Sequence, residues 1–307
     1  MRVTVLTGGV GGAKLVLGLT NILPADQITA IVNTGDDCVH LGLPVSPDID
    51  TLLYTLSGRF DEERGWGRIG ETWSFMAAVR ELGGPDWFNL GDGDLALHVT
   101  RLAALARGDS LSQVTAAFAR AFGLAATILP MSDDRIATVI DTDEGRLSFQ
   151  EYFVARKCAP TLRRVSFADA DSAKPGPGVL DAIAGADRIL IAPSNPWLSV
   201  DPILAVPGLR NALVTARSPV VAVSPLIAGR AVKGPTAKLM AELGLPLTNA
   251  SIADHYTGLI DGLLIDSGDG AEGVSMPVER TATLMRSLDD RKRVARAALD
   301  LAGALAT

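Results

Sequence analysis

Cysteine and long apolar runs are scarce in this chain, and each scarcity excludes a class of protein. Two cysteines in 307 residues are too few for a disulfide framework or a structural zinc site. No apolar run approaches the roughly 18 residues that would cross a membrane, and the first residues lack the basic and apolar regions of a signal peptide. We therefore expect a cytoplasmic protein with no membrane partner.

Basic residues are also too few for a general nucleic-acid-binding surface. Lys and Arg number 28 against 35 Asp and Glu, which gives a net charge of −7, whereas a surface that follows phosphates needs a basic excess. We expect no nucleic-acid partner. Hydrophobic residues make up 48% of the chain and charged residues 21%, a composition that supports a large buried core.

The N-terminal residues combine strand and helix patterns. Short buried strands are expected at "RVTVLT" and "ITAIVN", and between them Leu15, Leu19, Ile22 and Leu23 share one helical face. A strand, a helix and a second strand predict a parallel βαβ unit, with a glycine-rich loop at the carboxyl end of its first strand. Open α/β sheets bind ligands at that edge.

The middle of the chain departs from this pattern. Residues 61–122 look helical, with a capping box at Ser110 and Gln113. Strand-like runs then follow at "AATIL", "IATVI" and "LSFQEYFV", which predict a small antiparallel or mixed insertion. The parallel pattern returns at "RILIAP", "PVVAVSP" and "GLLID".

These patterns predict one α/β domain over residues 1–307. Its doubly wound, mostly parallel sheet is expected from about 1–60 and 180–270. An insertion of about 61–179 interrupts the sheet, and we expect it to be largely helical with a small strand-rich segment.

The loop "TGGVGGAK" is similar to two phosphate-binding loops without matching either. The dinucleotide pattern G-x-G-x-x-G would need glycine at Lys14, and the P-loop pattern would need glycine at Ala13 and a hydroxyl at Leu15. What remains is a flexible backbone whose N–H groups can approach a phosphate at a helix N-terminus, with a cation nearby. A strand-to-helix turn without a ligand is the alternative. The predicted nucleotide-binding residues here are Gly8, Gly9, Val10, Gly11, Gly12 and Lys14.

Acidic residues gather at the same edge. "NTGDDC" and "SPDIDT" place Asp36, Asp37, Asp48 and Asp50 within fifteen residues, and hard divalent cations prefer carboxylate oxygens. Asp48 and Asp50 point the same way in an extended segment but do not share a face in a helix. The alternative for Asp48 is that it caps a helix beginning near Ile49.

Two further loops carry polar side chains toward this edge. "LGDGDLALH" repeats the D-x-D spacing with Asp92 and Asp94, and its glycines would let the backbone turn around a ligand. A solvated turn is the alternative for the pair, and a hydrogen-bonded structural histidine is the alternative for His98. Ser194 and Asn195 follow a buried strand in "APSNPW", where prolines on both sides restrict the loop.

Taken in order, eight motifs identify a family resemblance. They are "TGGVGGAK", "NTGDD", "SPDIDTLLY", "RGWG", "LGDGDLALH", "LPMSDD", "APSNP" and "AVSPLIAG". Over residues 1–270 the chain resembles the 2-phospho-L-lactate transferase family of deazaflavin coenzyme F-420 biosynthesis. The resemblance implies a Rossmann-like fold, a homodimer and a requirement for magnesium. It also implies transfer of a phospholactyl, phosphoenolpyruvyl or phosphoglyceryl group from a guanosine-diphosphate-linked donor to the terminal hydroxyl of the deazaflavin Fo, with release of GMP.

The resemblance also suggests roles for the donor-side residues. The diphosphate would lie on the glycine loop and Lys14. Magnesium would be held by Asp50, assisted by Asp36 or Asp37, and would neutralise charge on the diphosphate. The guanosine half would contact Ser194, Asn195, Ser224 and Pro225.

On the acceptor side several roles stay open. Asp48, Asp92 or Asp94 would orient the attacking hydroxyl or take its proton, and Trp66 would stack on the deazaflavin or serve as a rim or core residue. The predicted catalytic residues are Asp48, Asp50, Asp92 and Asp94. The predicted substrate contacts are Asp50, Trp66, Asp92 and His98.

One motif departs from the family pattern. The family's "LGDRDLATH" has arginine and threonine where this chain has Gly93 and Leu97, so a fixed-charge planar donor is lost unless a neighbour such as Arg101 replaces it. The competing hypothesis is a non-catalytic nucleotide-sugar-binding regulator of the gluconeogenesis-factor type, which shares a glycine loop and an acidic second-strand end. An NAD-dependent oxidoreductase is disfavoured because the third fingerprint glycine is absent.

Overall fold

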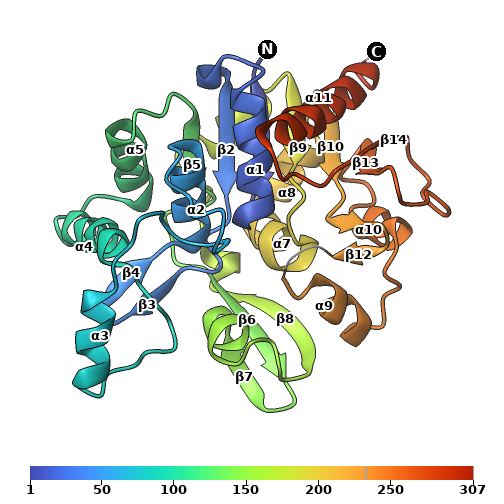
Figure 1. Ribbon diagram of the computed structural model, residues 1–307. Coiled ribbons are helices and arrows are strands. Elements are labelled where there is room, and N and C mark those ends of the chain that lie inside the picture. Colours follow the sequence, from blue (N-terminus) through green and yellow to red (C-terminus); the bar gives the residue numbers. More distant parts are fainter. Residues whose placement is uncertain (232–233, 307) are drawn as a thin grey trace.

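A seven-stranded sheet forms the centre of the computed structural model, which describes residues 1–231 and 234–306 (Figure 1). Every strand pair within it is parallel. The strand order is β14-β13-β10-β9-β1-β2-β5. Its strands are β1 (Val3–Thr7), β2 (Ile28–Val32), β5 (Thr127–Pro130), β9 (Arg188–Ile191), β10 (Val220–Val223), β13 (Gly262–Asp266) and β14 (Val278–Thr281). Because the chain proceeds outward from β1 first in one direction and then in the other, the sheet is doubly wound and confirms the predicted fold class.

The sheet is covered on both faces, which explains its uninterrupted apolar strands. Alternate residues of β1 face opposite cores, with Val3 and Val5 in one and Leu6 in the other. The first core also contains residues of α1 (Gly9–Thr20), α2 (Pro47–Leu56) and α11 (Leu288–Ala304). The second contains residues of α6 (Val179–Ala184), α7 (Asp201–Ala205), α8 (Leu209–Val214), α9 (Thr236–Glu242) and α10 (Asn249–His255).

A helical excursion separates β2 from β5 and lies at the left of Figure 1. It contains the hairpin of β3 (Cys38–His40) and β4 (Leu43–Val45), followed after α2 by α3 (Ser74–Glu81), α4 (Asp92–Ala106) and α5 (Leu111–Ala121). The capping box predicted for α5 is confirmed. Ser110 Oγ accepts the N–H of Gln113 at 3.3 Å, and Gln113 Oε1 accepts the N–H of Ser110 at 2.8 Å.

A second excursion is the three-stranded antiparallel sheet at the bottom of Figure 1, with strand order β7-β6-β8. Its strands are β6 (Ala137–Thr142), β7 (Gly145–Ser148) and β8 (Leu162–Ala168). Two predictions for this region are wrong. "AATIL" forms β5, which pairs with β2 in the central sheet, and "EYFV" lies in a π-helical turn, Glu151–Ala155. A short apolar run specifies neither its pairing partner nor, by itself, its secondary structure.

The domain boundaries therefore differ from the predicted ones. The expected insertion over 61–179 is two excursions on either side of β5, and the core extends beyond 270 through β14 and α11. α11 packs closely on α1 at Gly18. A Cβ at this position would lie only 2.3 Å from the carbonyl oxygen of Arg291, so the contact requires glycine. Both chain ends lie at the top of Figure 1. Within residues 1–231 and 234–306, no helix combines the length and apolar character needed to cross a membrane.

Short elements connect these parts of the chain. They are the 3₁₀ turns Ala25–Gln27 and Ala170–Ser172, the π-helical turn Pro196–Val200 and the two-residue strands β11 (Leu226–Ile227) and β12 (Arg230–Ala231).

Candidate active site

The candidate site is a cavity of about 720 Å³ at the switch point between β1 and β9. Ser194, after β9, joins the two loops that meet there, because its Oγ donates to the carbonyl of Gly8 at 2.7 Å and accepts the N–H of Gly8 at 3.3 Å. Most residues that the sequence predicted for the site line this cavity. They are Gly8, Gly9, Val10, Gly11, Lys14, Asp36, Asp48, Asp50, Trp66, Asp94, His98, Ser194, Asn195, Ser224 and Pro225.

The glycines of the loop serve different purposes. Gly9 is the first residue of α1 and has φ of +64°, a conformation that favours glycine. A Cβ at Gly12 would lie 1.9 Å from Thr7 Oγ1, and among the described residues Gly12 is not part of the cavity wall. The structure therefore gives Gly12 a packing role, and its predicted nucleotide contact has no support in this geometry.

Lys14 reaches the cavity from α1, and local contacts restrain its side chain. Its Nζ donates to the carbonyl of Met285 at 3.0 Å and lies 3.8 Å from Glu62 Oε2. Met285 also lines the cavity. The ammonium group of Lys14 thus lies at the cavity wall, next to the segment that precedes α11.

Asp48 connects α2 to the glycine loop. α2 has Ser46 at its N-cap and Pro47 at its first position, so Asp48 lies within the first turn and does not cap the helix. Its Oδ1 accepts the N–H of Gly9 at 2.7 Å, and its Oδ2 accepts from Asn33 Nδ2 at 3.0 Å. Burial raises the pKa of Asp48 to about 6, although these hydrogen bonds oppose the shift.

The two aspartates after β2 differ in their position relative to the cavity. Asp36 lines it, and its buried Oδ1 has no hydrogen-bond partner in the described part of the chain. Burial and the charge of Asp48 raise the pKa of Asp36 well above its ordinary value. Asp37 lies outside the cavity lining found among the described residues, and its Oδ2 accepts from Ser46 Oγ at 2.6 Å. Asp36 is therefore the better placed of the two for a cation.

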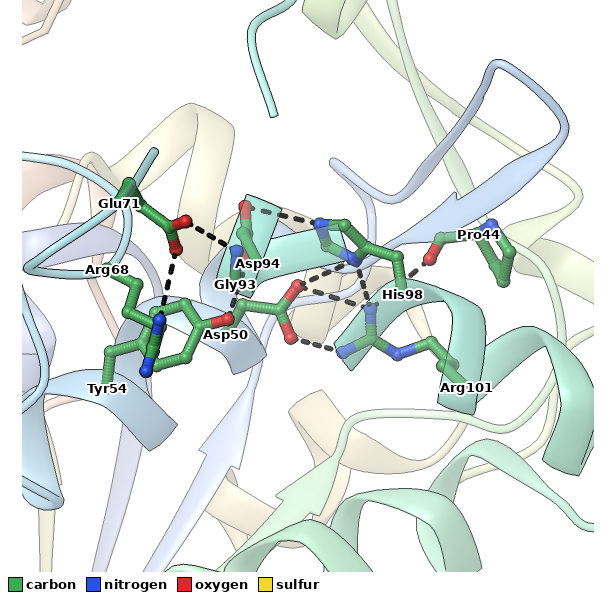
Figure 2. A network of polar contacts seen from close by, with 9 residues as sticks. All are labelled: Pro44, Asp50, Tyr54, Arg68, Glu71, Gly93, Asp94, His98 and Arg101. Atoms are coloured by element: carbon green, nitrogen blue, oxygen red, sulfur yellow. Dashed lines mark hydrogen bonds and ion pairs between the residues drawn. The ribbon is translucent and has the colours of Figure 1, made fainter. Parts of the chain in front are cut away.

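Asp50 lies two positions after Asp48 in α2, so the two do not share a helical face. Asp50 forms an ion pair with Arg101 (Figure 2). Its Oδ1 contacts Nη2 of Arg101, and its Oδ2 lies 3.2 Å from Nη1. The extended arrangement, in which Asp48 and Asp50 point the same way, is wrong because both lie in α2. Arg101, on α4, was considered from the sequence only as a replacement for the arginine missing at Gly93, and its pairing with Asp50 was not predicted.

Asp94 is held by two groups from different helices. Tyr54 O–H donates to its Oδ1 at 2.6 Å, and His98 Nε2 lies 3.3 Å from its Oδ2. Burial alone would raise the pKa of Asp94, but the contacts with His98 and Tyr54 bring it below its ordinary value. Asp94 is thus an ionised acceptor at the cavity wall, whereas burial raises the pKa of Tyr54 far above its ordinary value.

Asp92 has a structural position. Its carboxylate accepts from Thr72 Oγ1 at 2.5 Å and from the N–H groups of Ser74 and Phe75 at 3.1 and 3.0 Å, which begin α3. In the described ranges Asp92 does not line the cavity. The catalytic and substrate roles predicted for Asp92 have no support in this geometry. The sequence did not reveal this, because an aspartate that accepts N–H groups of a neighbouring helix looks the same in sequence as one that binds a ligand.

Arg68 lies beside Gly93, the residue that departs from the arginine of the resembled motif "LGDRDLATH". A Cβ at Gly93 would lie 1.9 Å from Arg68 Nη1, and Nη1 lies 3.7 Å from Glu71 Oε1. Glu71 in turn accepts the N–H of Gly93 at 2.6 Å (Figure 2). The guanidinium next to Gly93 is therefore that of Arg68, whereas the guanidinium of Arg101 is paired with Asp50.

Aromatic side chains form another part of the cavity wall, from both excursions of the chain. They are Trp66, Trp87, Phe88, Phe149 and Phe153. Trp66 is 44% exposed, which places it at the rim. Phe149 and Phe153 stack at 5.4 Å between ring centroids and 11° between planes. Sequence reasoning missed these two because it assigned their segment to a strand, although their i, i+4 spacing suits a helical turn.

The polar side chains on the β9 and β10 side mainly organise their own loops. Asn195 Oδ1 accepts the N–H groups of Trp197 and Leu198, and Ser224 Oγ donates to Asn249 at 2.6 Å. These bonds restrain the loops that follow β9 and β10. A ligand on this side would therefore contact mainly the loop backbone, because the polar atoms of these side chains already form hydrogen bonds within the protein.

Comparisons with known proteins match nearly the whole chain. A family model described as 2-phospho-L-lactate transferase CofD matches residues 3–300. A phosphoenolpyruvate transferase of Kitasatospora aureofaciens is 45% identical and covers 98% of both chains. Those of Streptomyces coelicolor and Mycolicibacterium smegmatis are 41% and 40% identical, and cover 98% and 99% of both chains.

Solved structures give the fold. The crystal structure of protein BH3568 from Bacillus halodurans superposes with a TM-score of 0.66 at 20% identity and covers 97% of this chain and 99% of that one. A second crystal structure of BH3568, described as a member of the UPF0052 family, gives a TM-score of 0.64 at 18% identity and covers 97% of this chain and 98% of that one.

Proposed function

This chain belongs to the 2-phospho-L-lactate transferase CofD family, and on that premise we propose that it transfers a three-carbon phosphoacid group in coenzyme F-420 biosynthesis. The donor is a guanosine-diphosphate-linked acid, the acceptor is the terminal hydroxyl of the deazaflavin Fo, and GMP is released. Of phosphoenolpyruvate, phospholactate and phosphoglycerate, we place phosphoenolpyruvate first. Relatives that are 40–45% identical over nearly the whole chain are named phosphoenolpyruvate transferases.

One observation carries the proposal: a single cavity joins an anion-binding type of loop to an aromatic wall. At about 720 Å³ it has the volume of a site for sizeable ligands. The α1 N-terminus and Lys14 suit the diphosphate of the donor, while Trp66, Phe149 and Phe153 suit a flat ring system. A transferase must hold donor and acceptor side by side, and the carboxylates of Asp36, Asp48 and Asp94 line the same cavity.

The residues present fit a magnesium ion. Asp36 and Asp48 are buried at the cavity wall with raised pKa values, and the unpartnered Oδ1 of Asp36 is an acceptor that burial leaves unsatisfied among the described residues. No cluster of three or more His, Cys, Asp or Glu side chains suited to a metal occurs in 1–231 or 234–306. Magnesium often binds through only one or two carboxylates together with substrate phosphates. We therefore propose Asp36 and Asp48 as its ligands.

This assignment differs from the one made from the sequence, in which Asp50 holds magnesium with help from Asp36 or Asp37. Both oxygens of Asp50 contact the Arg101 guanidinium, whose positive charge neutralises that of Asp50. The oxygens of Asp48 accept only from neutral N–H groups, so the Asp48 charge is available to a cation. When bound, magnesium would neutralise charge on the diphosphate and so favour departure of GMP.

Asp94 is the residue we propose to orient the attacking hydroxyl of Fo. It lines the cavity, and its lowered pKa keeps it ionised as a hydrogen-bond acceptor. Tyr54 and His98 fix its direction from behind. The hydroxyl would donate to Asp94 and present its oxygen to the phosphorus of the donor.

The decisive experiment is a reaction of the purified protein with Fo, magnesium and each of the three activated donors. We expect a deazaflavin phosphodiester and an equal amount of GMP, both measured by liquid chromatography and mass spectrometry, with the highest kcat/KM for the phosphoenolpyruvyl donor. If neither product forms with any donor, the transferase proposal is wrong. Thermal shift would then test the regulator hypothesis, which requires stabilisation by UDP-sugars in preference to GDP.

A homodimer is a further part of the proposal, because the family resemblance implies one. Light scattering coupled to size-exclusion chromatography tests it directly. A mass of one 32.1 kDa chain at micromolar concentration would contradict it.

A further inference from the structure

Arg101 is a fully buried charge whose partners lie next to the cavity. Its side chain is 1% exposed, yet no part of it belongs to the cavity lining in the described ranges. Its guanidinium contacts both oxygens of Asp50, the carbonyl of Pro44 at 3.2 Å and Nδ1 of His98 at 3.1 Å (Figure 2). A buried guanidinium is costly unless it is paired, and well-packed apolar residues can often replace a buried ion pair without loss of stability.

The contact with His98 has a chemical consequence. A guanidinium only donates hydrogen bonds, so Nδ1 of His98 accepts at this contact. The ring proton is then on Nε2, which lies 3.3 Å from Oδ2 of Asp94 and has no hydrogen-bond partner among the residues that the structure describes. Arg101 thus selects the histidine tautomer that presents an N–H to Asp94.

Two carboxylates of the cavity wall therefore depend on one guanidinium. Asp50, from α2, contacts it directly, and Asp94, from the first turn of α4, contacts it through His98. We infer that Arg101 is a positioning residue, which holds Asp50 in place and fixes the His98 tautomer so that Asp94 points into the cavity. This inference rests on the proposed transferase function for its effect on rate. Its effect on His98 is independent of that function.

The test compares Arg101→Met, Arg101→Lys and the control Arg107→Met. Arg107 lies just after the same helix and pairs with Asp109 on an exposed surface. For Arg101→Met we expect kcat to fall about 100-fold, as for a misplaced reacting group, with the donor KM changed less than about threefold. Arg101→Lys restores one charge but not the fork, so we expect it to recover about tenfold of that loss. The control keeps the wild-type kcat.

A spectroscopic measurement separates positioning from a merely structural role. The chain has three histidines, so the nitrogen-15 signals of His98 can be assigned by comparison with His98→Gln. In the wild type we expect the signature of protonated Nε2 and unprotonated Nδ1. In Arg101→Met this preference is lost, whereas Arg107→Met retains it.

A second variant keeps the test possible if Arg101→Met fails to fold. If Arg101→Met does not fold, Asp50→Asn/Arg101→Met removes both buried charges, and its His98 signals are measured instead. A wild-type kcat in a folded Arg101→Met protein, or an unchanged His98 tautomer, would overturn the inference. A wild-type protein that forms no product refutes the proposed function alone, because the tautomer measurement still decides the role of Arg101.

Discussion

Asp48 accepts the backbone N–H of Gly9 through Oδ1 at 2.7 Å, so a carboxylate from α2 occupies one donor of the glycine loop. The contact brings a negative charge to the place where an anion would otherwise be attracted by the N-terminus of α1. Burial disfavours that charge, which is why the pKa of Asp48 rises to about 6. A diphosphate beside Asp48 therefore needs a cation between the two.

The first prediction concerns the stability of the metal-free protein. The pKa of Asp48 is raised from 3.8 to about 6 in the folded state, so the folded protein holds this proton more tightly than the unfolded chain. That contribution is fully present below about pH 4 and is lost as pH rises to about 6. On the order of 3 kcal/mol is involved. Urea unfolding of the wild type and Asp48→Asn at several pH values measures it, and an equal pH slope in the two proteins would contradict it.

Magnesium is expected to have the opposite pH dependence. Its ligands must be ionised, so the ion binds more tightly as pH rises through the pKa of Asp48. We expect the rise in melting temperature with excess magnesium to be larger at pH 7.5 than at pH 5. Asp36→Asn and Asp48→Asn should each reduce it, whereas Asp92→Asn should not. Full magnesium stabilisation in the first two variants would refute the assigned ligands.

Replacement of Gly12 by alanine should be tolerated better when Thr7 is also replaced by a smaller residue. The new Cβ would lie 1.9 Å from Thr7 Oγ1 and 3.0 Å from Ser194 Oγ, so Gly12→Ala overpacks a buried contact and should lower the free energy of unfolding by about 1–3 kcal/mol. Removing the hydroxyl in Thr7→Ala/Gly12→Ala should restore part of that loss. Chemical denaturation of Gly12→Ala, Thr7→Ala and the double variant tests this coupling, and additive effects of the two substitutions would exclude it.

The capping box of α5 offers a test away from the cavity. Ser110→Ala removes the acceptor of the Gln113 N–H and should cost about 1 kcal/mol of unfolding free energy. Thr100→Ala is the matched control, since this exposed hydroxyl bonds only to the Ala96 carbonyl of its own helix among the contacts described. Equal stabilities of the two variants would argue against the cap. Neither change should alter the affinity for donor or acceptor.

Cys38 should react slowly with alkylating reagents. Burial, followed by the charge of Asp37, raises the pKa of Cys38 from 9.0 to about 12, and only the thiolate is nucleophilic. At pH 8 we expect iodoacetamide to modify Cys38 more than about tenfold more slowly than a free cysteine peptide. Mass spectrometry of the intact and digested protein measures the rate. Asp37→Asn should accelerate it, and a peptide-like rate in the wild type would contradict the predicted environment.

Local pattern was enough to predict much of the fold. The strands at "RVTVLT", "ITAIVN", "RILIAP", "PVVAVSP" and "GLLID" all lie in the central sheet, because uninterrupted apolar runs are typical of strands covered on both faces. The capping box at Ser110 was readable for a similar reason, since both partners lie within one turn. In contrast, "AATIL" was assigned to the wrong sheet, because pairing with β2 depends on residues about a hundred positions away.

The sequence by itself determined which segments gather at the switch point: the loop from Gly8 to Gly11, the segment of Asp36 after β2 and the loop at Ser194. Chain direction alone brings the carboxyl ends of β1, β2 and β9 to one edge. Only the tertiary structure decided what those side chains do there. Asp92 caps α3, and Arg101 crosses from α4 to Asp50, 51 positions earlier in the chain. A carboxylate that binds a ligand and one that binds a helix or a guanidinium share the same local pattern, and the partner that distinguishes them comes from a distant segment.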